Sequence, residues 1–200
     1  SFEEVWRKGY AMLWGLRKDP VALAGFRADP AAHPLKTPSG KIEIYSERLA
    51  AETADWILPE GDAVSPVPGF RRTWDMPGDP LAARYPLQCI GIHGHGRIHS
   101  TFANLPGLRS LHPDAVLINP VDAAARGIED GDPCEVFNGR GAVRVPARVT
   151  PRIMPGVCAI PQGAWRRSEV IGGRAVDAGG CVNTLTSHRP SPYAKGNSQH

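Results

Sequence analysis

The chain has 200 residues, a formal net charge of +3 at pH 7 and a charged fraction of 22%. A charge this small argues against a nucleic-acid-binding stripe and against a membrane-surface patch, so no nucleic acid is expected as a partner. The 20 prolines and 22 glycines favour short strands and many turns over a helical bundle.

Two helices are predicted at the start of the chain. Ser1 and Glu4 form a capping box, and the apolar residues that follow recur at helical spacing: Phe2, Val5, Trp6, Leu13 and Leu16. Asp19-Pro20 predicts a second short helix, with Asp as N-cap, that ends before Asp29-Pro30.

A strand and a third helix are predicted next. Lys41–Tyr45 alternates between polar and apolar residues and predicts a strand, and Ser46 predicts the cap of a helix that runs to about Asp55. Leu58–Pro86 is rich in proline and lacks periodicity, which predicts an irregular connector. Two aromatic residues are expected to anchor it, Phe70 and Trp74.

The stretch Gly91–Thr101 follows a strand predicted from Tyr85 to Ile92 and contains three glycines, three histidines, an arginine and two hydroxyl groups. Glycine lets the backbone approach a ligand closely, and the polar side chains are donors that suit phosphate or a heterocycle. We interpret the stretch as a binding loop at a strand end.

Three other interpretations of this loop exist. It could be a solvent-exposed turn, since polar glycine-rich stretches usually are. Zinc could bind His93, His95 and His99, but the stretch offers no Cys, Asp or Glu as a fourth ligand. A nucleotide-hydrolase phosphate loop is excluded because no Gly-Lys-Ser or Gly-Lys-Thr follows.

From Ala115 onward, the predicted elements are short and closely spaced. Asn119 and Pro120 start a helix through Ala125 that Gly127 ends, and Asn138-Gly139 predicts a hairpin. The predicted strands are 116–118, 134–137, 142–149 and 157–160. The alternation from Val143 to Val149 requires one buried face. A small β-barrel with inserted helices is the natural architecture.

The four cysteines, at positions 89, 134, 158 and 181, form no Cys-x-x-Cys pair and therefore predict neither a zinc knuckle nor an iron–sulfur run. Cys89, Cys134 and Cys158 lie in apolar, strand-like contexts, where buried free thiols are expected. No stretch approaches the ~20 apolar residues of a membrane span, and no signal peptide is present. We expect the chain to be a fragment of a longer protein.

Several ordered motifs resemble the C-terminal part of the molybdopterin oxidoreductases, and most closely the catalytic subunit of the anaerobic dimethyl sulfoxide reductases. The motifs are 37–46, His93 with 97–100, 118–123 with 126–128, Gly131-Asp132, 155–157, 183–186 and the tail 189–197. Together they extend over nearly the whole chain, which makes the resemblance more specific than any one motif.

The resemblance implies a mainly β fold with short helices, a double-psi β-barrel with an N-terminal helical extension. The implied domains are 1–36, a helical extension from a preceding domain; 37–86, a strand, a helix and the proline-rich connector; and 87–200, the barrel. The barrel would bind molybdopterin guanine dinucleotide, two per molybdenum, in an enzyme that reduces S-oxides or N-oxides. The family's serine ligand to molybdenum and its iron–sulfur motif match nothing here, so the cluster is expected only in a missing N-terminal part.

The resemblance assigns cofactor contacts, and no catalytic or metal-ligating role, to residues of this chain. They are His93, Gly94, Arg97, His99, Ser100, Thr101, Asn119, Asp122, Gln162, Trp165, Asn183 and Thr184. Asn119 and Asp122 fit equally well as the cap and first-turn acid of a helix. Arg97 is expected to bind pyrophosphate, so Arg97→Ala should weaken cofactor retention without loss of a core contact.

The resemblance also implies partners: the remainder of the catalytic subunit, an iron–sulfur electron-transfer subunit and a membrane anchor subunit. The expected location is the periplasmic or cell-envelope side of the membrane, with the cytoplasm as the alternative. The isolated fragment should be inactive. Other functions stay open, namely the same domain of a formate dehydrogenase or of a nitrate, polysulfide or thiosulfate reductase, or a non-catalytic binding module.

Overall fold

The computed structural model describes residues 1–12, 20–72 and 74–194. The chain forms two compact units: one contains Ser1–Asp55 and Ser65–Gly69, and the other contains Trp56–Val64 and the chain from Phe70 onward. The domain boundaries expected after residues 36 and 86 stay a prediction. None of the helices described is long and apolar enough to cross a membrane.

In its described residues, the first unit contains three short helices: α1 (Phe2–Lys8), α2 (Ala24–Ala28) and α3 (Glu47–Thr53). The predicted caps of α1 and α3 are confirmed, because the hydroxyl groups of Ser1 and Ser46 accept bonds from backbone N–H groups one turn ahead. Helix α1 ends at Gly9, which adopts φ 76°, so it is shorter than the apolar spacing predicts. Leu13 and Leu16 lie outside the described residues.

Two predictions for this unit are wrong. Helix α2 starts at Ala24 and not at Pro20, and its N-cap is Leu23; the predicted cap, Asp19, lies outside the described residues. Lys41–Tyr45 forms no strand, and it leaves its Ile side chains 70% and 73% exposed. A strand needs a partner for its backbone groups, and within the described residues no segment pairs with this one.

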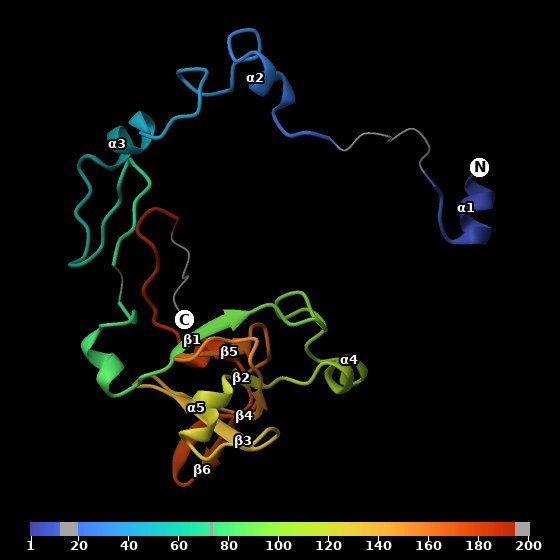
Figure 1. Ribbon diagram of the computed structural model, residues 1–200, viewed down its shortest axis with the longest axis vertical. Coiled ribbons are helices and arrows are strands. Elements are labelled where there is room, and N and C mark those ends of the chain that lie inside the picture. Colours follow the sequence, from blue (N-terminus) through green and yellow to red (C-terminus); the bar gives the residue numbers. More distant parts are fainter. Residues whose placement is uncertain (13–19, 73, 195–200) are drawn as a thin grey trace. The chain divides into compact units, whose positions relative to one another are not determined.

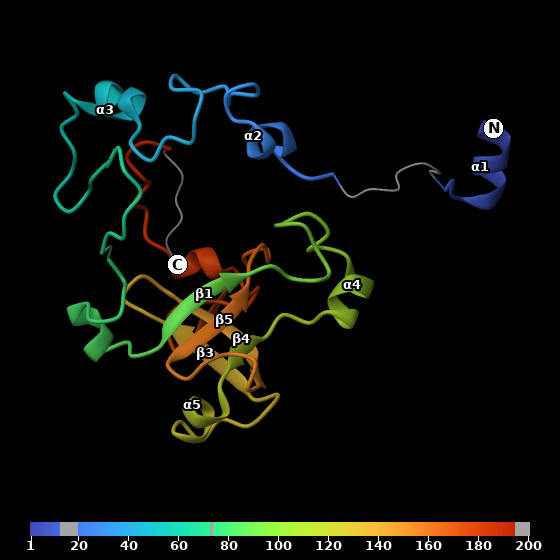
Figure 2. The same ribbon diagram turned by 45° about the horizontal axis from the view of Figure 1, so that its top comes forward.

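The part of the second unit that the structure describes is built on one sheet of seven short strands. They are β1 (Gln88–Ile92), β2 (Val116–Ile118), β3 (Pro133–Phe137), β4 (Ala142–Val149), β5 (Val157–Pro161), β6 (Ser168–Ile171) and β7 (Arg174–Asp177). The strands pair in the order β1-β5-β2-β4-β7-β6, and β3 pairs with β4. Figures 1 and 2 show β1 and β5 side by side. The expected mainly β fold with short helices is confirmed.

Four short helices accompany the sheet in the described part of this unit. Helices α4 (Pro106–Leu111) and α5 (Pro120–Ala124) connect strands, η1 (Pro80–Ala83) precedes β1, and η2 (Val182–Thr184) follows β7. The α5 helix and its Asn119 cap are confirmed. The connector before β1 is irregular apart from η1, as predicted, and β1 starts at Gln88 rather than Tyr85. Trp74 anchors it, because its Nε1 donates to Ser187 Oγ and its ring lies 4.0 Å from the Arg189 guanidinium. Phe70 is exposed and does not anchor it.

The core lies against the inward face of β4. Val143, Val145 and Ala147 are buried while Arg144 and Arg148 are exposed, so the predicted alternation is confirmed. Side chains from β2, β5 and the segment after η2 complete the core: Val116, Ile118, Cys158, Ile160 and Leu185. The β3–β4 hairpin is also confirmed, and residues 138–141 form its loop.

Candidate functional site

The register of β1 on β5 brings two loops together. The two strands run parallel, with Cys89 opposite Cys158 and Ile92 opposite Pro161. The ladder continues by one bond, in which Gln162 N donates to Ile92 O at 2.8 Å. Because parallel strands end at the same edge of a sheet, the residues that follow them, His93 and Gln162, are neighbours.

His93, His99 and Gln162 form a polar cluster at this edge. The Gln162 Nε2 lies 3.3 Å from His93 Nε2 and 3.4 Å from His99 Nδ1, and the two imidazole rings are 5.6 Å apart. Both histidines are exposed. His95 does not join them, since its ring lies 6.0 Å from that of His112. The three histidines weighed as zinc ligands are therefore not assembled around one point.

The loop after β5 packs directly against the loop after β1. Gly163 has φ 90°, and a Cβ at this position would overlap the His99 carbonyl oxygen, so only glycine fits there. Trp165 Nε1 donates to Ser100 O at 3.0 Å while the indole stays 57% exposed. These contacts fix the backbone beside the polar cluster and leave an aromatic face open to a ligand.

Arg97 links the loop after β1 to the end of β5. Its Nε donates to Gln162 O at 2.8 Å and its Nη2 to Pro161 O at 2.9 Å. Its guanidinium also pairs with the Asp114 carboxylate at 2.7 Å, and the two side chains are only 6% and 13% exposed. The expectation that Arg97→Ala loses no core contact is therefore wrong, because the guanidinium is a buried structural link.

Residues 87–200 match the family model described as Molydopterin dinucleotide binding domain. The chain belongs to this family. It is 47% identical over 204 residues to the dimethyl sulfoxide reductase DmsA of Escherichia coli (strain K12), covering 100% of this chain and 24% of that protein. It is 40% identical over 175 residues to the dimethyl sulfoxide/trimethylamine N-oxide reductase of Cereibacter sphaeroides, covering 82% of this chain and 20% of that protein.

The match identifies residues 87–200 as a molybdopterin-dinucleotide-binding domain of the dimethyl sulfoxide and trimethylamine N-oxide reductase family. The chain spans about a quarter of the length of DmsA. The solved structure of acetylene hydratase from Pelobacter acetylenicus superposes with a TM-score of 0.60 at 22% identity, over 80% of this chain and 22% of that one. That likeness supports the fold.

The molybdopterin-binding domain brings some predicted site residues together and leaves others elsewhere. His93, His99, Ser100, Gln162 and Trp165 meet at the edge described above. Gly94 lies against Arg97 and Pro161 below them, and Thr101 N bonds to Ile98 O within the same loop. Their contacts with a cofactor stay a prediction.

Asn119 and Asp122 are occupied by the protein itself. Asn119 Oδ1 accepts from Val121 N at 2.9 Å and its Nδ2 donates to Ile153 O at 2.7 Å, so the residue caps α5 and ties it to the turn after β4. Asp122 Oδ2 accepts from Gly156 N at 2.7 Å. Both side chains thus have the structural roles that the sequence offered as an alternative.

Replacement of Asn119 by Ala should lower the free energy of unfolding by about 2–3 kcal/mol, the sum of a lost cap and a buried carbonyl left without its donor. Asn119→Asp should lose less, because it keeps the cap acceptor. Urea unfolding monitored by circular dichroism measures both. Asn183→Ala, at an exposed position, is the control, and an equal loss there would contradict the assignment.

Sequence reasoning missed Asp177, which organises the segment that leads to the predicted residues Asn183 and Thr184. This carboxylate is 2% exposed and accepts from the backbone N–H groups of Arg167, Gly179 and Cys181. Its Oδ2 also accepts from the hydroxyl of Thr184, one of the predicted site residues, at 3.2 Å. Asn183 is exposed. The signal in the sequence was a single acidic residue after Ala175-Val176, two positions before Gly179-Gly180.

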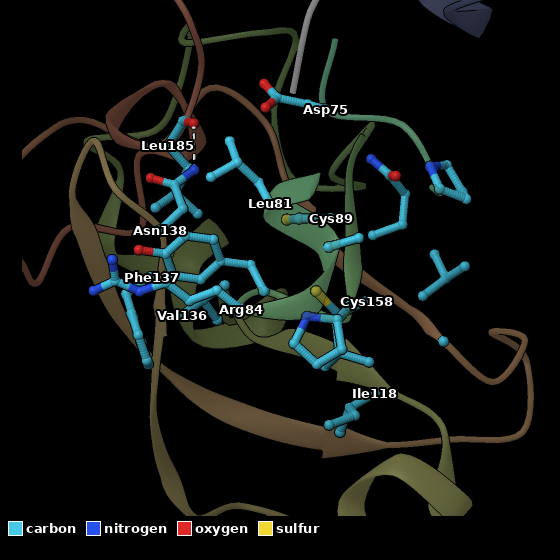
Figure 3. A pocket seen from close by; sticks show the side chains of 18 of the residues that line it. Asp75, Leu81, Arg84, Cys89, Ile118, Val136, Phe137, Asn138, Cys158 and Leu185 are labelled. Atoms are coloured by element: carbon cyan, nitrogen blue, oxygen red, sulfur yellow. Dashed lines mark hydrogen bonds between the residues drawn. The ribbon is translucent and has the colours of Figure 1, made fainter. Parts of the chain in front are cut away.

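A separate pocket of about 900 Å³ lies at the other end of β1 and β5 (Figure 3). Its walls come from the connector with η1, from β3, and from the start of β1 and β5. None of the twelve predicted site residues lines it. Family membership therefore leaves this pocket, with its three cysteines Cys89, Cys134 and Cys158, without a role.

Proposed function

We propose that this domain binds molybdopterin guanine dinucleotide and orients it in a molybdenum reductase of S-oxides or N-oxides. The observation that carries the proposal is the cluster of His93, His99 and Gln162 at the adjoining ends of β1 and β5. Its support from outside the site is the family match over residues 87–200 and the identity to reductases of dimethyl sulfoxide and trimethylamine N-oxide.

The side chains at this edge fit the heterocycles of such a cofactor. Imidazole and amide groups both donate and accept hydrogen bonds, which suits the polar edges of a pterin or a guanine. The exposed indole of Trp165 offers a face on which a planar ring can stack. Phosphate recognition falls to exposed hydroxyl and backbone groups, among them Ser100 and Thr101, because Arg97 is committed to protein acceptors.

The bound cofactor would supply the two-electron chemistry through its molybdenum, and the chain would supply position. Gln162 orients both imidazoles, Trp165 and Gly163 hold the loop backbone, and Arg97 fixes the two loops to each other. No residue of this cluster is required to move a proton. The domain's contribution is binding and orientation.

His99→Ala and Gln162→Ala should each reduce the pterin retained by the whole protein, and together they should weaken retention about tenfold, since two neutral hydrogen bonds contribute about 1–3 kcal/mol. The measurement is mass spectrometry of the pterin and of the nucleotide that acid hydrolysis releases. His33→Ala, an exposed histidine of the first unit, is the control. Apo forms are compared by thermal unfolding so that lost binding is not mistaken for lost packing.

Two results would contradict parts of the proposal. Undiminished pterin content in the double variant would remove the cluster from the cofactor site. A released nucleotide other than a guanine nucleotide would leave pterin binding in place and refute the guanine form.

We also propose, from the resemblance to the dimethyl sulfoxide reductase catalytic subunits, that the whole protein works with an iron–sulfur electron-transfer subunit and a membrane anchor subunit on the periplasmic side. Purification of the tagged protein from separated periplasmic, membrane and cytoplasmic fractions tests this assembly. Recovery from the cytoplasmic fraction without either subunit would refute it.

A further inference from the structure

Two cysteines face each other across neighbouring strands at the pocket end of the sheet. Cys89 on β1 and Cys158 on β5 are register partners in a parallel ladder. Adjacent strands lie about 4.8 Å apart, and register partners point to the same face of the sheet. A disulfide spans Cα atoms about 4.4–6.8 Å apart, a range that includes this general strand spacing. Both thiols are free.

Both cysteines border the pocket, Cys158 with only 3% of its surface exposed. Cys89 and Cys158 each line it, and Figure 3 shows their side chains one above the other within it. The remaining wall is largely apolar, with Leu81, Val136 and Phe137 among its side chains. Cys134 lines the same pocket but lies on β3, where its register partner is Val145, so it has no thiol opposite it.

The two thiols differ in acidity because one donates a hydrogen bond to the other. The hydrogen bond from the Cys89 thiol to Cys158, together with burial, raises the pKa of Cys89 far above its usual range. The same bond lowers the pKa of Cys158, assisted by the charge of Arg126 and opposed by burial. Cys158 is therefore the first of the pair to form a thiolate, the nucleophile in thiol–disulfide exchange.

We propose that Cys89 and Cys158 are a dithiol modification site that closes to a disulfide by exchange with a small disulfide compound entering the pocket. The Cys158 thiolate attacks one sulfur of the compound, forms a mixed disulfide and releases one thiol, which takes the proton of Cys158. Cys89 then loses its proton and attacks Cys158 Sγ, and a second thiol leaves. Two protein thiols are oxidised and one small disulfide is reduced to two thiols.

The modification would act on the two strands that carry the polar cluster. From Cys89 and Cys158 the ladder runs without a break to Ile92 and Pro161, directly before His93 and Gln162. Strand β1 is at the edge of the sheet and pairs only with β5 among the described strands. A disulfide here would fix β1 to its single neighbour and hold the two loops in register.

The test exposes the whole protein, reduced and freed of reductant, to oxidised glutathione in the absence of air. Remaining thiols are alkylated, and the protein is cut with trypsin without reduction. Cleavage after Arg84, Arg97, Arg126, Arg140, Arg152 and Arg166 places Cys89, Cys134 and Cys158 on three separate peptides. Mass spectrometry should find the 85–97 and 153–166 peptides linked, with two glutathione thiols released per link.

Variants separate this site from general thiol oxidation. Cys134→Ala should form the link as the native protein does, because it removes a thiol of the same pocket that has no partner. Cys89→Ala should stop at a glutathione adduct on Cys158. Alkylation of both Cys89 and Cys158 in oxidant-treated native protein would overturn the proposal, as would a link that contains Cys134. The link between Cys89 and Cys158, or its absence, is measured in the native protein and does not depend on the folding of any variant.

Discussion

Arg97→Ala is expected to lower the free energy of unfolding by about 3–5 kcal/mol, because the change leaves the Asp114 carboxylate buried without its partner. The carbonyl oxygens of Pro161 and Gln162 lose their donors at the same time. Arg97→Lys should restore part of the loss, since an ammonium group supplies the charge but cannot reach the carboxylate and both carbonyls as a planar fork does.

Urea unfolding of the apo protein measures these changes. Arg109→Ala, at an exposed position of α4, is the matched control and should stay within about 0.5 kcal/mol of the native protein. In a double-mutant cycle, Arg97→Ala combined with Asp114→Ala should cost less than the sum of the two single changes. Additive losses would show that the two side chains do not depend on each other.

Arg97→Ala should also reduce cofactor content, but by an indirect route. The guanidinium holds the loop of His93 and His99 to the loop of Gln162. Its removal frees both loops, so the polar cluster loses its geometry even though the guanidinium bonds to Gln162, Pro161 and Asp114. Cofactor loss that exceeds the loss in His99→Ala, together with lower apo stability, would distinguish this route from a direct phosphate contact.

The elements that sequence predicted well are those whose signals are local. The Asn119 cap, the turn at Asn138-Gly139 and the alternation of β4 each depend on residues within a few positions, and each is confirmed. Lys41–Tyr45 had an equally clear alternation but formed no strand. A strand also needs a distant partner, and nothing in five residues specifies one.

The arrangement of the candidate site depends on non-local pairing, which explains what the sequence did not predict. The sequence predicts that His93 and Gln162 contact the same cofactor. That their loops touch each other follows from the parallel register of β1 on β5, which the sequence does not reveal. The role of Arg97 depends on carbonyl groups that this register brings beneath it. The hairpin of β6 and β7 was missed because most residues of the two strands are exposed and form no apolar alternation. Gly172-Gly173 is nevertheless a two-residue turn signal, with φ above zero at both residues.

Asp177→Ala is expected to be as destabilising as the loss of Arg97, again about 3–5 kcal/mol, because several buried donors lose one shared acceptor. The carboxylate bonds to Arg167 N and Gly179 N through Oδ1, and to Cys181 N and the Thr184 hydroxyl through Oδ2. Packing prevents the loop from collapsing around the gap, since a Cβ at Gly179 would already overlap the Trp165 carbonyl oxygen.

Asp177→Asn separates the two carboxylate oxygens. An amide can place its oxygen at one of the two positions and must then direct an N–H group at the donors of the other, so Asn should recover only part of the stability despite its equal size. Protection of the Gly179 and Cys181 amides from hydrogen exchange reports which half is lost. Asp130→Asn, which changes an exposed acceptor for Val149 N, is the control. Native stability and native amide protection in Asp177→Asn would mean that this loop is held by its glycines and its packing, and that the buried carboxylate is not what fixes Thr184.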